Sequence, residues 1–169
     1  VLVCLPTGEG KSVIFQIPAL VRGFSTQKLT IVITPLKALM RDQVFSLWRK
    51  GFDQSVDYIS SDRDPWEIDE VYQGILDNRI KIVYVAPERF RNQRFLDIIH
   101  KRYEMDSGFE YIVFDEAHCI SLWGFEFRPD YLFAIKYIRN HFRKNDKSLT
   151  HLLLFSATVT ESVIRNFDE

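Results

Sequence analysis

The sequence has few cysteines and no glycine-rich or proline-rich tract, and each shortage excludes a class of protein. Its 169 residues include only 2 Cys, Cys4 and Cys119, which excludes a disulfide framework, and neither has a neighbouring Cys or His at the spacing of a zinc site. The 7 Gly and 6 Pro exclude collagen-like and low-complexity chains. We therefore expect reduced, buried thiols in an intracellular protein.

The sequence also lacks an excess of either charge and a segment that could span a membrane. The 22 Lys and Arg residues balance 23 Asp and Glu residues, so binding to nucleic acid requires a local basic surface. No apolar run approaches the ~18 residues that cross a bilayer, and the first residues lack the features of a signal peptide, so we expect no membrane partner. The length predicts one globular domain over residues 1–169.

Two kinds of hydrophobic pattern alternate along the chain. Short apolar runs rich in β-branched and aromatic residues predict buried strands over residues 1–4, 29–33, 56–59, 80–85, 111–114 and 152–155. Stretches with helical periodicity separate them, over residues 12–21, 36–50, 66–76, 88–102, 131–142 and 160–167. This alternation predicts an α/β fold, with a mainly parallel β-sheet covered by helices on both faces. In such a sheet, ligands bind at the carboxyl ends of the strands.

A phosphate-binding loop is predicted between the first strand and the first helix. Residues 5–12 read Leu-Pro-Thr-Gly-Glu-Gly-Lys-Ser, although the strict pattern has Gly in place of Leu5. The glycines allow backbone N–H groups to turn toward a phosphate, and the start of the helix adds a positive dipole end. Lys11 is expected to reach the β- and γ-phosphates, and the Ser12 hydroxyl to coordinate Mg²⁺. The candidate ATP-binding residues are Thr7, Gly8, Glu9, Gly10, Lys11 and Ser12.

Two carboxylates follow the predicted strand at residues 111–114. Asp115 is expected to hold Mg²⁺ through water, and Glu116 to orient and polarise the water that attacks the γ-phosphate. An Asp-Glu pair after a strand can also cap a helix, but the phosphate loop upstream favours hydrolysis. Ser156 and Thr158 follow the last predicted strand, where their hydroxyls either couple to the same sheet edge or cap the last helix.

In their order, these segments resemble superfamily-two helicases, and within them the RecQ family of DNA helicases. The similar segments are residues 5–12 for motif I, 34–44 for motif Ia, 84–90 for motif Ib, 115–118 for motif II and 156–158 for motif III. RNA helicases of the DEAD-box and DEAH types share this order. The discriminating segment is 119–131, Cys-Ile-Ser-Leu-Trp-Gly-Phe-Glu-Phe-Arg-Pro-Asp-Tyr, which is similar to the aromatic-rich loop that follows motif II in RecQ proteins.

The resemblance implies a RecA-like P-loop NTPase fold and several contacts with DNA. The aromatic-rich loop offers rings that stack on unpaired bases and a cation for phosphate. Its candidate residues are Trp123, Phe125, Phe127 and Arg128. Motif Ia follows the backbone of the tracking strand in the family, and its candidate residues are Pro35, Lys37, Arg41 and Gln43. Packing of the aromatic rings against another domain and a solvated basic helix face are the structural alternatives.

Two positions of the loop depart from the family pattern Trp-Gly-His-Asp-Phe-Arg-Pro. Phe125 replaces the His, and Glu126 replaces the Asp. A phenyl ring stacks on a base but exchanges no hydrogen bonds, so this departure bears on the coupling between DNA binding and hydrolysis. The resemblance implies that His118 joins the catalytic group by linking motif II to motif III. An isolated His is otherwise a structural residue.

The resemblance also implies an activity and partners. It implies an ATP-dependent DNA helicase that uses ATP and Mg²⁺, binds single-stranded and forked DNA without reading sequence, and moves 3′ to 5′. ATP in such helicases lies between two RecA-like domains, and the second domain supplies arginine fingers. We expect residues 1–169 to be the first domain, a fragment that lacks the upstream adenine-recognition segment and is nearly inactive without the second domain.

Other functions remain open at this point. One alternative is an RNA helicase or a duplex translocase with the same core. Another is a non-catalytic nucleic-acid clamp gated by nucleotide. Phe125 favours the clamp, whereas Lys11, Asp115 and Glu116 favour a working ATPase.

Overall fold

The computed structural model describes residues 1–4, 10–106, 108–117, 129–142 and 150–156 and is built around a 6-stranded β-sheet. The strands are β1 (Leu2–Cys4), β2 (Thr30–Ile33), β3 (Val56–Ile59), β4 (Ile82–Val85), β5 (Tyr111–Phe114) and β6 (His151–Ser156). They lie in the order β1-β6-β5-β2-β4-β3, and every neighbouring pair is parallel. The predicted parallel sheet is therefore confirmed, strand by strand.

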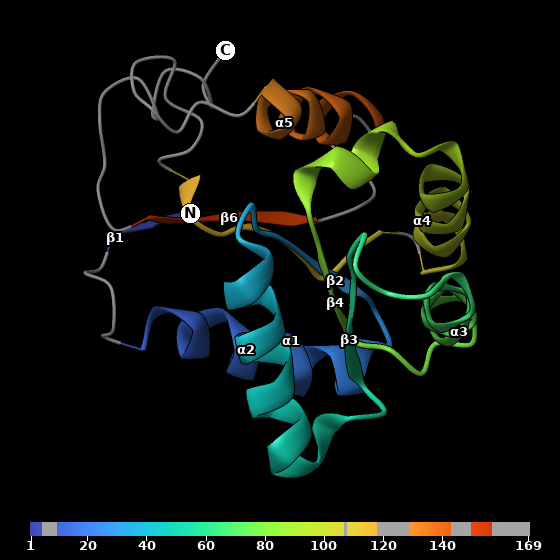
Figure 1. Cartoon of the computed structure of the whole chain (residues 1–169). Helices are drawn as coiled ribbons and strands as arrows, with labels where there is room; N and C mark the ends of the chain where they lie inside the picture. The colour runs from blue at the N-terminus through green and yellow to red at the C-terminus, as the bar shows by residue number, and fades with distance from the viewer. Residues whose placement is uncertain (5–9, 107, 118–128, 143–149, 157–169) are drawn as a thin grey trace.

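Helices cover both faces of this sheet, as the alternating pattern predicts (Figure 1). They are α1 (Lys11–Thr26), α2 (Lys37–Leu47), α3 (Pro65–Leu76), α4 (Gln93–Asp106) and α5 (Pro129–His141). Val32 and Val113 pack with α1 and α2 on one face, whereas Ile31 and Ile112 pack with α3, α4 and α5 on the other. Because successive side chains of a strand point to opposite faces, each central strand contributes to two hydrophobic cores.

The helix predicted over residues 88–102 is divided in the structure at Asn92. A 3₁₀ turn (Pro87–Arg91) precedes α4, and the Asn92 backbone between them is extended. The Asn92 side-chain oxygen accepts the backbone N–H of Phe95 at 3.0 Å, which caps the N-terminus of α4. Hydrophobic periodicity continues across this cap, so the periodicity did not reveal the boundary.

Other helix boundaries also differ from the prediction. Helix α1 continues to Thr26, past Pro18 in its interior. Helix α2 ends in a π-helical turn (Trp48–Phe52), in which Gly51 takes a φ of 88° that favours glycine. The helix predicted over residues 160–167 lies outside the described part of the chain.

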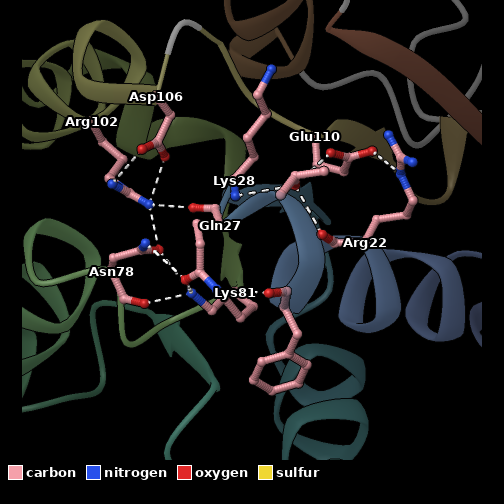
Figure 2. A network of polar contacts seen from close by, with 10 residues as sticks. Arg22, Gln27, Lys28, Asn78, Lys81, Arg102, Asp106 and Glu110 are labelled. Carbon is pink, nitrogen blue, oxygen red and sulfur yellow. Dashed lines mark hydrogen bonds and ion pairs between the residues drawn. The ribbon is translucent and has the colours of Figure 1, made fainter.

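A polar network fills the edge of the sheet at which the strands begin (Figure 2). The amino-edge network consists of Arg22, Thr26, Gln27, Asn78, Lys81, Arg102, Asp106 and Glu110. The buried Lys81 ammonium donates to Gln27 Oε1 at 2.6 Å and to Asn78 Oδ1 at 2.8 Å. The buried Arg102 guanidinium donates to the Gln27 carbonyl at 2.7 Å and pairs with Asp106 at 2.6 Å.

The network joins the ends of helices to the starts of strands. Gln27 and Asn78 have left-handed backbones, with φ of 62° and 60°, just after α1 and α3. The buried Glu110 carboxylate, directly before β5, accepts from Arg22 at 2.8 Å and from Thr26 at 2.9 Å. These contacts fix how α1, α3 and α4 meet the sheet.

Composition gave one wrong expectation about the thiols. The Cys4 side chain is exposed, as is that of Leu2 in the same strand. Cys119 lies outside the described residues. Within the described ranges, no helix combines the length and the apolar character needed to cross a membrane.

Candidate active site

All the strands end at one edge of the sheet, which we call the carboxyl edge, because every neighbouring pair is parallel. The order β1-β6-β5 brings the start of α1, the end of β6 and the residues after β5 to one stretch of this edge. Cys4 pairs with Ser156, and Phe114 pairs with Leu154. Two segments about a hundred residues apart in sequence therefore meet there.

Lys11 contacts both members of the acidic pair. Its Nζ lies 3.1 Å from Glu116 Oε1 and 4.0 Å from Asp115 Oδ1. At most 9% of each of these side chains is exposed, so one cation and two carboxylates share a site with little surrounding water. Gly10, directly before α1, has a φ of 73°, and a Cβ there would meet no atom within 4 Å. The left-handed backbone, rather than space, favours glycine at this position.

Hydrogen bonds fix the orientation of Asp115. Its N–H donates to the Ile33 carbonyl at 2.9 Å, and its own carbonyl accepts the hydroxyl of Tyr131 in the first turn of α5. Its Oδ1 accepts the Glu116 N–H at 3.1 Å, and its Oδ2 accepts the Gln43 amide at 3.2 Å. Both oxygens of the carboxylate are thus directed by groups of the protein.

Electrostatics favour a further cation beside Asp115. Burial raises the pKa of the Asp115 carboxyl, and the neighbouring Glu116 charge raises that pKa further. The hydrogen bond from Gln43 and the charge of Lys11 act in the opposite direction without cancelling this effect. A divalent cation would stabilise the ionised pair.

Glu116 has an unusual backbone for a residue that carries a Cβ. Its φ is 57°, in the left-handed region, which costs on the order of 1–3 kcal/mol. This residue directly follows Asp115, and the two neighbouring carboxylates accept from different donors: Glu116 accepts from Lys11, and Asp115 accepts from Gln43. Strain of this kind is concentrated at functional sites.

Gln43 lies with the acidic pair, although the sequence interpretation grouped it with the DNA contacts of motif Ia. Its side chain is buried, and its amide group also contacts Gln16 of α1. Helical geometry was the overlooked signal, because Gln43 follows Arg41 by two residues and so lies about 200° around α2. Nothing in the sequence alone pointed to Gln16 or Tyr131.

The other motif Ia residues lie at the start of α2. Pro35 is buried, whereas Lys37 and Arg41 are exposed. The Lys37 ammonium donates to the Ser61 hydroxyl, and Arg41 pairs with Asp62 at 3.1 Å with 45% of its side chain exposed. Both partners belong to the loop after β3, so this basic surface is partly neutralised by the protein itself.

The remaining candidates are placed only in part. Ser12 is half-buried in the first turn of α1, and Ser156 is buried at the end of β6. The predicted site residues outside the described part of the chain are Thr7, Gly8, Glu9, His118, Trp123, Phe125, Phe127, Arg128 and Thr158. Their roles stay predictions.

The described donor set fits a triphosphate with magnesium. Mg²⁺ prefers carboxylate and hydroxyl oxygens and takes its other ligands from phosphate and water. Asp115 and Ser12 offer such oxygens, and Lys11 offers a buried cation at a helix N-terminus, where phosphate binds favourably.

Comparison with known proteins identifies the family. The DEAD/DEAH box helicase family matches residues 1–167. The chain belongs to this family. This DEAD/DEAH box helicase domain is 38% identical over 160 residues to the ATP-dependent DNA helicase RecQ of Bacillus subtilis, a match that covers 94% of the chain and 24% of that protein. It is 38% identical over 131 residues to the ATP-dependent helicase SGS1 of Saccharomyces cerevisiae, covering 78% of the chain and 9% of SGS1. The resemblance to RecQ helicases is thereby confirmed, over a small part of those proteins' length.

Solved helicase structures share the fold of this DEAD/DEAH box domain. The helicase MrfA, bound to DNA and AMPPNP, matches 99% of the chain and 23% of its own with a TM-score of 0.75 at 20% identity. The Mycobacterium smegmatis helicase Lhr, bound to ssDNA and AMP-PNP, matches 98% of the chain and 22% of its own with a TM-score of 0.71 at 18% identity. The predicted RecA-like fold is confirmed.

Proposed function

We propose that this chain is the first RecA-like domain of an ATP-dependent DNA helicase of the RecQ type, in which ATP hydrolysis drives 3′ to 5′ movement along DNA and strand separation. The meeting of Lys11 with Asp115 and Glu116 at the carboxyl edge carries the proposal. The relatives named ATP-dependent DNA helicases support DNA rather than RNA as the substrate. Because such an enzyme acts where DNA and ATP occur, we also propose an intracellular location.

Each described site residue has a role that its position allows. Lys11 binds the β- and γ-phosphates as a point charge at the start of α1. Asp115 and Ser12 hold Mg²⁺, which when bound neutralises charge on the phosphate oxygens. Glu116 orients the attacking water and accepts its proton. Lys11 pairs with Glu116 in the structure. When a bound triphosphate attracts Lys11 instead, the Glu116 carboxylate becomes available to accept a hydrogen bond from the attacking water.

The remaining candidates complete the proposed motor. Thr7, Gly8, Glu9 and Gly10 surround the phosphates, and His118, Ser156 and Thr158 connect hydrolysis to movement. DNA lies along Pro35, Lys37 and Arg41 and stacks on the aromatic-rich segment through Trp123, Phe125, Phe127 and Arg128. A second RecA-like domain of the same protein closes over ATP and supplies arginine fingers.

The decisive test replaces Glu116 with Gln in the full-length protein. The variant keeps the shape of the side chain but cannot accept a proton, so we expect DNA-stimulated ATP turnover to fall by about 10²-fold or more while ATP binding persists. Glu70→Gln, at an exposed position of α3, is the matched control and should keep wild-type turnover. Unchanged turnover in Glu116→Gln would eliminate this mechanism.

Fork substrates separate the proposal from its alternatives. We expect the full-length protein to unwind a DNA fork with a 3′ single-stranded tail in the presence of ATP and Mg²⁺. Unwinding of RNA alone would identify an RNA helicase, and ATP-dependent movement on duplex DNA without unwinding would identify a translocase. ATP-dependent binding to DNA without turnover would identify a clamp.

A further inference from the structure

A chain of buried polar side chains leads from three elements to Asp115. The Gln16 amide of α1 donates to the Tyr84 hydroxyl of β4 at 2.9 Å and makes a longer contact of 3.5 Å with Gln43 Oε1. Gln43 of α2 then donates from Nε2 to Asp115 Oδ2 at 3.2 Å. At most 8% of each of these residues is exposed. We call Gln16, Gln43 and Tyr84 the glutamine relay.

The relay holds Gln43 in one orientation. An ionised carboxylate only accepts hydrogen bonds, so the Gln43 NH₂ group must face Asp115 and its oxygen must face the Gln16 amide. If the Gln43 amide were flipped, its oxygen would face the Asp115 carboxylate oxygen and its NH₂ group would face the Gln16 NH₂ group, and neither pair can form a hydrogen bond. The relay therefore occupies Asp115 Oδ2 and leaves Oδ1 toward Lys11 and the Glu116 N–H.

Helix α2 carries basic residues on its other side. Lys37 and Arg41 are exposed and contact the loop after β3, whereas Gln43 is buried among the relay. A phosphate that competes with Asp62 for Arg41 acts on the same rigid helix that holds Asp115 from inside. The helix thus connects the exposed cations Lys37 and Arg41 with the acidic pair.

We propose that Gln43 is a positioning residue, which orients Asp115 for magnesium and makes α2 the connection between the basic surface and the hydrolytic site. This inference rests on the proposed function, in which Asp115 holds Mg²⁺. It replaces the DNA contact implied for Gln43 by the resemblance to motif Ia. Gln43 acts through Asp115, so its loss changes the response to magnesium and leaves the intrinsic affinity for DNA unchanged.

The test replaces Gln43 with Met in the full-length protein, because Met has a similar length and no amide. Two Mg²⁺ concentrations are measured. The first gives half of the maximal rate of DNA-stimulated ATP hydrolysis. The second gives half of the maximal increase in affinity for a fluorescent, non-hydrolysable ATP analogue. We expect both to rise by about 10-fold or more, with the maximal rate largely recovered at high Mg²⁺. Gln73→Met, at an exposed position of α3, is the matched control and should respond as wild type.

A second variant keeps the test decisive if Gln43→Met does not fold. Gln16→Met breaks the relay one step further from Asp115, so we expect a smaller rise in the same direction. If the folded variants have the same magnesium dependence as the wild type, the inference about Gln43 is overturned but the proposed function is not. Weaker DNA binding without nucleotide, as the sole effect, also overturns it and assigns Gln43 to a DNA contact. A wild-type protein without Mg²⁺-dependent, DNA-stimulated hydrolysis overturns the proposed function and the inference together.

Discussion

The two edges of the sheet both bury charged side chains, but they surround them differently. At the amino edge, Lys81 and Arg102 share the neutral oxygens of Gln27 and Asn78, and Arg102 also pairs with Asp106 (Figure 2). At the carboxyl edge, by contrast, two carboxylates adjacent in sequence share one lysine. The first arrangement separates like charges with amides, whereas the second concentrates negative charge.

This is the difference expected between buried charge that organises a fold and the buried charge of the proposed nucleotide site. At the carboxyl edge the pKa of Asp115 is raised by burial and by the Glu116 charge, and Glu116 itself has a left-handed backbone. Both features are unfavourable in the folded chain, and a bound divalent cation relieves the first of them. The amino edge contains no such adjacent pair of acids among its network residues, so its value lies in stability.

Removing a charge at the amino edge should have the largest effect on stability. Arg102→Met leaves the partly buried Asp106 carboxylate without its ion-pair partner and removes one donor each from the Gln27 carbonyl and from Asn78 Oδ1, so we expect the free energy of unfolding to fall by about 3 kcal/mol. Urea titration of the full-length protein, followed through the transition of this domain, measures it. The exposed Arg49→Met serves as the control. If Arg102→Met instead lowered ATP turnover per folded molecule and left the free energy of unfolding unchanged, the contrast between the two edges would be wrong.

Ligand binding should distinguish the edges next. An ATP analogue with Mg²⁺ at about 100 times its Kd should stabilise the wild-type domain by about 2.7 kcal/mol. Lys11→Met should lose most of this gain, because the phosphates lose their buried cation, whereas Arg102→Met should retain it. Thermal unfolding with and without the analogue provides the measurement. A full gain in Lys11→Met would contradict the proposed nucleotide site.

Removing a charge at the carboxyl edge should leave stability unchanged or slightly higher. Glu116→Gln removes one of two like charges and keeps an oxygen for Lys11, so we expect the free energy of unfolding to rise by at most about 1 kcal/mol. The raised pKa of Asp115 makes its charged form unfavourable at neutral pH, and this disadvantage disappears as pH falls and the carboxyl is protonated. The difference between variant and wild type should therefore narrow toward acidic pH in urea titrations. A variant clearly less stable than wild type at neutral pH would refute the contrast.

The exposed basic side of α2 should show the smallest stability effect. Arg41→Ala breaks an exposed ion pair with Asp62, so we expect a change within about 0.5 kcal/mol. The affinity for single-stranded DNA should nevertheless fall, and the negative slope of log K against log salt should become shallower by about one, because one phosphate contact is lost. Fluorescence anisotropy at several salt concentrations measures both. Arg49→Ala, at another exposed arginine, is the control. If Arg41→Ala has the same salt slope as this control and the wild type, Arg41 does not contact DNA.

Local patterns predicted most of the elements but not every boundary. The apolar runs located all the described strands, and the run at 80–85 differs from β4 only at its first residues. The break at Asn92 was missed because hydrophobic periodicity records which residues face the core and not where the backbone turns. The exposure of Cys4 was missed because an apolar run does not reveal whether other elements cover its strand.

The amino-acid order alone specified the alternating strands and helices, Lys11 at the start of a helix and the acidic pair after a strand, since each depends on chemistry within a few neighbouring residues. Folding specified which of these groups meet. Strand order placed Lys11 3.1 Å from Glu116, 105 positions along the chain, and helix packing brought Gln43 to Asp115. The amino-edge network arose in the same way, because long-range pairing and the exclusion of water depend on how distant segments pack.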